Sequence, residues 1–98
     1  MIPGSTTKLT EEIVASAGTI TVTKDLVRVT GNTQIDTINP RFGGGFSGIV
    51  FLVPVDNNVA VSTTGNVLGG GSITMLQNKV TVLVYSRGLG KWITHALS

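Results

Sequence analysis

The chain contains no cysteine among its 98 residues. Neither a disulfide bond nor a zinc site made of thiolates can form within it, and the redox state of its compartment stays open. Charged side chains make up only 12% of the sequence, about half of the share in a typical soluble domain. The seven Lys and Arg residues are scattered, with no basic run and no basic–aromatic pattern, so we expect no nucleic-acid partner.

Aromatic residues are also scarce, at 5%, although hydrophobic residues reach 41%. The core must therefore consist mainly of Val, Ile, Leu and Ala. A single domain of this length buries only about 60–65% of the surface that its unfolded chain exposes. Such a core is thin for a monomer, which favours an oligomer whose copies bury apolar surface against each other.

Long hydrophobic runs are missing as well. The longest apolar run covers residues 49–53, which is far too short to span a membrane, so we expect no membrane partner. We also expect no signal peptide, because no basic start is followed by an apolar stretch and a cleavage site.

The first 18 residues differ from the rest of the chain. Residues 1–9 combine Pro, Gly and hydroxyl side chains, which predict a flexible arm. Residues 10–18 favour a short helix, with Thr10 as its N-cap, Glu11 and Glu12 at its positive N-terminal end and Gly18 as its end. The alternative is an extended arm that docks on a partner.

From residue 19 onward the pattern is that of short β-strands. Thr, Val and Ile alternate with a period of two, or form short apolar runs, between clusters of turn residues. The sequence therefore predicts an all-β domain over residues 19–98, a small sandwich or barrel of short antiparallel strands, behind an N-terminal arm or short helix over residues 1–18. The continuous apolar run over 48–55 is typical of a strand buried on both faces, and residues 86–90 are expected to form a hairpin loop. The segments expected as strands are 19–23, 26–30, 34–38, 48–55, 72–76, 79–85 and 91–97.

A glycine-rich stretch over residues 43–48 has the spacing G-x-G-x-x-G of a dinucleotide-binding loop. That loop needs a strand before it, a helix after it and an acidic residue about 20 positions further on. Here a turn precedes the glycines, a predicted strand follows them, and no acidic residue lies at the required distance. We therefore expect neither nucleotide binding nor a cofactor.

Groups for acid–base or metal chemistry are few. His95 is the only histidine and lies near the end of the chain, where a surface or interface role is more common than catalysis. The five acidic residues form no pair that resembles a general acid and base, and no cluster has the spacing of metal ligands. We therefore expect no enzyme, and assign no catalytic, cofactor-binding or metal-binding residue.

Candidates for contacts with partners come from the arm, from the glycine-rich loop and from the last strand. A Trp exposed on a β-sheet can stack on a sugar ring, but burial in the protein or in a subunit interface is more common. Arg41 lies beside the glycines, where it can reach a neighbouring subunit. The residues expected to contact a partner are Ile2, Pro3, Leu9, Arg41, Phe42 and Trp92.

Several motifs follow one another along residues 35–92, namely IDTINP, GFSG, FLVP, TGNV, VTVLVY and GKW. Together they resemble a small β domain that recurs in virion proteins of tailed bacteriophages, such as capsid decoration (cement) proteins, head fibres and tail fibres. The resemblance covers about residues 19–95. It departs from the usual pattern at Ile93, where an aromatic residue normally follows the Trp.

The resemblance implies a structural module, commonly a homotrimer, without catalytic residues. The small size and the start at Met1 favour a decoration protein on the capsid surface of the virion, with the major capsid protein and copies of itself as partners. The arm over residues 1–18 is expected to contact the shell. The alternative is a receptor- or glycan-binding module of a head or tail fibre, with Trp92, Tyr85 and Arg87 at its site.

Overall fold

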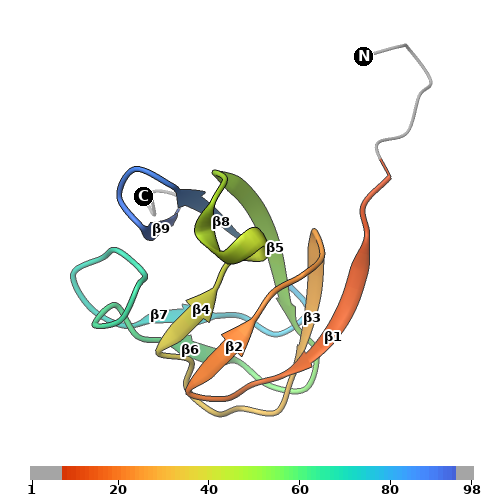
Figure 1. Ribbon diagram of the computed structural model, residues 1–98. Coiled ribbons are helices and arrows are strands. Elements are labelled where there is room, and N and C mark those ends of the chain that lie inside the picture. Colours follow the sequence, from red (N-terminus) through yellow and green to blue (C-terminus); the bar gives the residue numbers. More distant parts are fainter. Residues whose placement is uncertain (1–7, 95–98) are drawn as a thin grey trace.

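The computed structural model describes residues 8–94, which form an all-β domain of nine short strands and one turn of 3-10 helix (Figure 1). The expected all-β class is confirmed. The strands are β1 (Glu11–Ala15), β2 (Thr19–Thr21), β3 (Leu26–Thr30), β4 (Thr37–Asn39), β5 (Gly48–Pro54), β6 (Val59–Val61), β7 (Ile73–Met75), β8 (Thr81–Ser86) and β9 (Lys91–Thr94), and the 3-10 turn η1 covers Arg41–Gly44.

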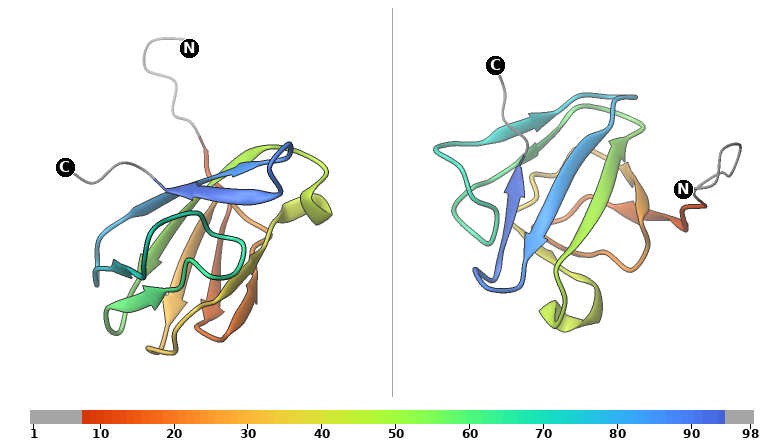
Figure 2. Two further views of the ribbon diagram at one scale, coloured as in Figure 1. Left: turned by 90° about the vertical axis from the view of Figure 1, so that its left-hand side faces the viewer. Right: turned by 90° about the horizontal axis from the view of Figure 1, so that it is seen from above.

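The main sheet contains five strands in the order β1-β3-β5-β8-β9, and the pairs β2-β4 and β6-β7 form two smaller sheets. Figures 1 and 2 show these strands wrapped around a common interior. Isolated bridges join Ile35 to Val61 and Val67 to Trp92, and so link the small sheets to each other and to β9. The result is a closed, barrel-like arrangement of three sheets.

Half of the strand pairs are parallel, whereas the sequence predicted antiparallel strands. β1 pairs with β3, β3 with β5, and β2 with β4 in parallel, while β5-β8, β8-β9 and β6-β7 are antiparallel. The reason is the path of the chain. From β1 to β5 it alternates between the main sheet and the β2-β4 sheet, so each strand pairs with the next but one, which runs in the same direction.

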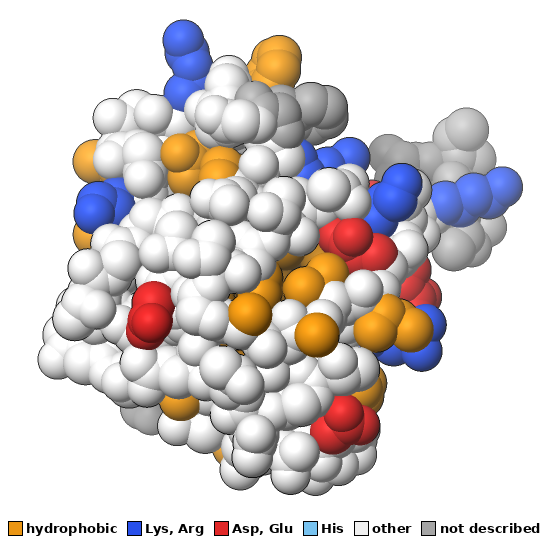
Figure 3. Space-filling view, turned by 60° about the horizontal axis from the view of Figure 1, so that its bottom comes forward, with side chains coloured by type: hydrophobic (Ala, Val, Ile, Leu, Met, Phe, Trp, Pro, Cys, Tyr) orange, Lys and Arg blue, Asp and Glu red, His pale blue; other side chains and the backbone are white. Residues whose placement is uncertain are grey.

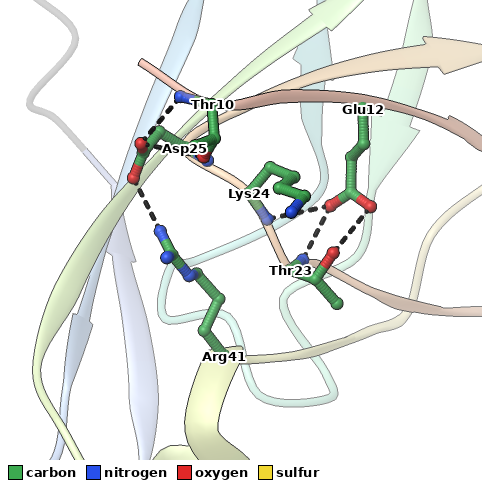
Figure 4. Close-up of polar contacts among 6 residues, drawn as sticks. All are labelled: Thr10, Glu12, Thr23, Lys24, Asp25 and Arg41. Atoms are coloured by element: carbon green, nitrogen blue, oxygen red, sulfur yellow. Dashed lines mark hydrogen bonds and ion pairs between the residues drawn. The ribbon is translucent and has the colours of Figure 1, made fainter. Parts of the chain in front are cut away.

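The helix expected over residues 10–18 is wrong, because residues 11–15 form strand β1 of the main sheet. Glu12, which was expected to favour a helix N-terminus, instead binds the turn at Thr23 and Lys24. Glu12 accepts hydrogen bonds from the backbone N–H of Thr23 at 2.7 Å, from the Thr23 hydroxyl at 2.9 Å and from the backbone N–H of Lys24 at 3.1 Å (Figure 4). β1 is therefore part of the domain rather than of an arm.

The interior is aliphatic, as the composition predicted, apart from Met75 and the aromatic pair Tyr85 and Trp92. All three sheets contribute to this one core. Strand β5 is not buried on both faces, which corrects the sequence prediction. Val50 and Leu52 are buried in the core, whereas Ile49, on the opposite face, is 50% exposed.

The predicted hairpin loop between β8 and β9 is confirmed. The two strands are antiparallel, and the N–H of Gly90, at a φ of 65°, donates to the carbonyl of Ser86 at 2.8 Å.

Gly65 has no positive φ, so its backbone conformation does not require a glycine; the close approach of another chain segment does. A Cβ at this position would overlap the backbone carbonyl of Asp36, so a glycine lets the two chain segments lie in contact.

We predict that Gly65→Ala destabilises the fold by roughly 2–3 kcal/mol, because backbone atoms would have to move to admit the methyl group. Gly70→Ala is the matched control. Its Cβ would have no atom within 4 Å, and we expect a change within about 0.5 kcal/mol. Urea unfolding of both variants checks this, and equal midpoints for the two would contradict it.

Candidate functional site

A pocket of about 230 Å³ lies where the first residues of β5 meet β8, β9 and η1. Its inner wall is apolar, formed by Val22, Val50 and the rings of Tyr85 and Trp92, all of which are buried. Phe46 lies at the mouth and is 67% exposed. The pocket thus combines a hydrophobic interior with an opening to solvent.

The polar rim of the pocket is an ion pair. Nη1 of Arg41 lies 2.6 Å from Oδ1 of Asp25, and both side chains are about one-third exposed. Thr10 holds the other carboxylate oxygen, because its backbone N–H and its hydroxyl each donate to Oδ2 at 3.0 Å (Figure 4). The backbone N–H of Asp25 donates in return to the Thr10 hydroxyl at 3.1 Å. The start of the described chain is thereby fixed to the rim.

The pKa of the Asp25 carboxyl lies below its usual value. The main causes are the hydrogen bonds from Thr10, first from its backbone and then from its side chain, and the Arg41 guanidinium adds to them. Partial burial acts in the opposite direction but is outweighed. Asp25 is therefore held in its charged form as a structural anion.

Trp92 is a core residue rather than an exposed stacking platform. Only 2% of it is exposed, its Nε1–H donates to the carbonyl of Ile38 at 2.9 Å, and its ring meets Tyr85 edge-on with centroids 5.1 Å apart. Arg87 lies in the β8–β9 turn and does not line the pocket. The glycan site expected from Trp92, Tyr85 and Arg87 therefore lacks an exposed ring on which a sugar could stack.

The structure brings together two of the predicted contact residues, since Arg41 and Trp92 both line the pocket. Leu9, just ahead of β1, is 47% exposed. Phe42 lies in η1, and its side chain is not among the parts of the chain that the structure describes. The predicted contacts Ile2 and Pro3, and the single histidine His95, lie outside the described residues.

Each of the five acidic side chains has a structural partner. The partners of Asp25 and Glu12 are described above. Glu11 pairs with Arg28 at 2.6 Å, Asp36 accepts a hydrogen bond from the side chain of Gln34, and Asp56 accepts one from the backbone N–H of Gly31. Among residues 8–94 no three His, Asp or Glu side chains lie close enough to hold a metal ion. No helix in that part of the chain is long and apolar enough to cross a membrane.

A second feature, which sequence reasoning missed, is an apolar outer face on the main sheet. The strand register places Ile49 of β5, Val84 of β8 and Ile93 of β9 side by side, with exposures of 50%, 39% and 40%. Leu26, Phe51 and Val82 form an adjacent, partly buried row on the same face. We call these six residues the outer patch.

The signal for the outer patch was present in the sequence. Residues 49–53 and 82–85 are apolar at successive positions, and successive side chains of a strand point to opposite faces. The run over 48–55 predicted a strand buried on both faces, but the structure buries only one face of β5, and β8 likewise alternates between buried and more exposed residues. On the side of the molecule seen in Figure 3, apolar side chains reach the surface near the centre between polar and backbone atoms, and acidic and basic side chains lie around them.

Comparisons of the chain with protein-family models, with curated proteins and with solved structures gave no significant match.

We predict that Asp25→Asn destabilises the protein near neutral pH and that the difference shrinks in acid. A carboxyl whose pKa is lowered in the folded state stabilises that state above the pKa of the unfolded chain, and this contribution is lost as the pH falls through the folded-state pKa. The difference should therefore be full at pH 7 and begin to fall near pH 4, the ordinary range of an Asp carboxyl. Urea midpoints of the two proteins at pH 7 and pH 3 check this, and an unchanged difference would contradict it.

Proposed function

We propose that the protein is a structural virion protein of a tailed bacteriophage, a capsid decoration (cement) protein that binds the assembled head and stabilises it. The observation that carries this proposal is the outer patch. The solvent face of a β-sheet in a monomeric protein is normally polar, and a contiguous exposed apolar patch usually marks an interaction surface. Here three neighbouring strands each expose a branched aliphatic side chain.

Copies of the same chain are the occupants that we propose for the outer patch, in a homotrimer. Its six residues carry no charge. The charged side chains nearest to the patch on this face are Glu11, Arg28 and Lys91. Glu11 pairs with Arg28 at 2.6 Å, and Nζ of Lys91, two residues before Ile93, donates to the carbonyl of Gly65 at 3.2 Å. A second copy can therefore cover the patch while these three side chains keep their present partners at its edge, which avoids the cost of burying a charge without a partner.

The mechanism on the shell is passive. A protein that binds the assembled head but not its separated subunits stabilises the head by mass action. Three linked copies multiply the effect of weak individual contacts. The segment ahead of β1 is our choice for the contact with the major capsid protein, because its Pro, Gly and hydroxyl residues do not favour regular structure and such a segment can order when it binds. This segment is shorter than the arm expected from sequence, since residues 11–15 belong to the main sheet. The proposal includes no catalysis and no cofactor.

The proposal predicts that the purified protein cosediments with phage heads assembled without it. A variant lacking residues 2–7 should fold but bind at least about tenfold more weakly, because β1 and its contacts remain while the shell contact is lost. Gly70→Ala, at an exposed loop position, is the control that should bind normally. Failure of the full-length protein to sediment with heads would overturn the function, and equal binding of the truncated variant would overturn the role of the segment.

A further inference from the structure

We propose that the pocket binds a small neutral molecule made of one apolar ring and a single hydroxyl group, the chemical class of the phenols. In this complex the ring lies beside Val50 and Trp92, and the ligand hydroxyl pairs with the hydroxyl of Tyr85. The ligand is a free molecule, and its binding does not depend on the protein's being a decoration protein.

The pocket exists because a glycine stands where a side chain would otherwise face the interior. Gly48 begins β5 and lies on the same face of that strand as Val50 and Leu52, which are buried in the core. Its register partner is Tyr85, whose own partner on β9 is Trp92. The φ of Gly48 is not positive, and its chain neighbours aside, no described atom would lie within 4 Å of a Cβ here. Neither conformation nor close packing therefore requires this glycine, which leaves an open space beside two aromatic rings.

The size and the walls of the pocket suit one apolar ring. At about 230 Å³ the pocket exceeds the roughly 150 Å³ of an apolar protein cavity that binds benzene, so a six-membered ring with substituents fits. The buried side chains of Val22, Val50 and Trp92 form its inner wall, and Phe46 at the mouth adds a ring that is 67% exposed. Water gains few hydrogen bonds against such walls, so an apolar ring is a favourable replacement for it.

The hydroxyl of Tyr85 is the polar group that a ligand can pair with. Tyr85 is only 8% exposed, yet within residues 8–94 its hydroxyl makes no hydrogen bond. In that part of the chain no fully buried side-chain polar atom lacks a partner, so this hydroxyl reaches space that solvent can enter. It lies on the η1 side of the pocket, because a Cβ at Gly44 would be 2.9 Å from it and 3.6 Å from the ring of Pro40, a pocket residue. A hydroxyl can donate or accept, and so can its partner on the ligand.

The charges around the pocket favour a neutral ligand. Among the described residues that line it, Asp25 and Arg41 are the charged ones, and they pair at 2.6 Å. Hydrogen bonds from Thr10 keep the pKa of Asp25 low and its carboxylate charged, so the formal charges of the rim cancel. A charged ligand would lose hydration without gaining an unpaired counter-charge. A sugar would place several hydroxyl groups against apolar walls, whereas a phenol brings one, which Tyr85 can satisfy.

Binding of para-cresol and toluene, which differ only in the hydroxyl, tests the proposal in a cycle with Tyr85→Phe. Para-cresol should shift the indole N–H resonance of Trp92, the only Trp, in a saturable way with a Kd on the order of 1 mM. Tyr85→Phe should lower the preference for para-cresol over toluene about fivefold, the factor for one net hydrogen bond. The variant should keep its fold, because within residues 8–94 the removed hydroxyl has no partner to lose. No saturable shift, or an unchanged preference, would overturn the proposal.

Gly48→Leu and Gly70→Leu are the matched pair that locates the site. Both positions have open space at the Cβ, but only Gly48 lines the pocket. Gly48→Leu should weaken the binding of para-cresol at least about tenfold by filling the space, and Gly70→Leu should bind it normally. Equal binding by the two variants would contradict the site. N-acetyltyrosinamide presents the same phenol on a peptide unit, and tighter binding of this probe than of para-cresol would overturn the choice of a free molecule.

Discussion

Strand β5 carries apolar side chains on both faces of the main sheet, and the described part of the chain covers only one of them. Val50 and Leu52 point into the core that the small sheets close. Ile49 and Phe51 point outward, where the register aligns them with Val84 and Val82 of β8. The outer patch follows from this constraint, since no described element packs over it. The same short chain that builds a closed interior thus leaves an apolar surface that association can cover.

Local alternation in the sequence predicted where strands form but not how they pair. Residues 26–30 were predicted with the bounds that β3 has, because polar and apolar residues alternate there without interruption. The direction of pairing depends on the alternation of the chain between two sheets, which leaves no periodic signal. The expected helix over residues 10–18 failed for a related reason: Glu12, read as a helix-start signal, binds the Thr23–Lys24 turn, which is distant in sequence.

The candidate site was predictable only in part. Arg41 was selected for its place beside the glycines, and the structure does bring it to the same pocket as Trp92. That pocket is also lined by Asp25, which no motif in the sequence singles out and which long-range contacts with Thr10 and Arg41 hold in place. Trp92 itself proved to be a core residue, because Ile38 accepts its N–H and Tyr85 packs on its ring. Such contacts join positions far apart in the chain, and no short motif encodes them.

The native mass in solution tests most directly whether copies of the chain cover the outer patch. Light scattering at several concentrations should give a mass near three times 10.2 kDa that does not change with dilution. Val84→Lys, in the centre of the exposed row, should lower that mass, whereas Thr74→Lys, on the exposed side of β7, should not. A mass of 10.2 kDa for the unmodified protein at every concentration would contradict the account.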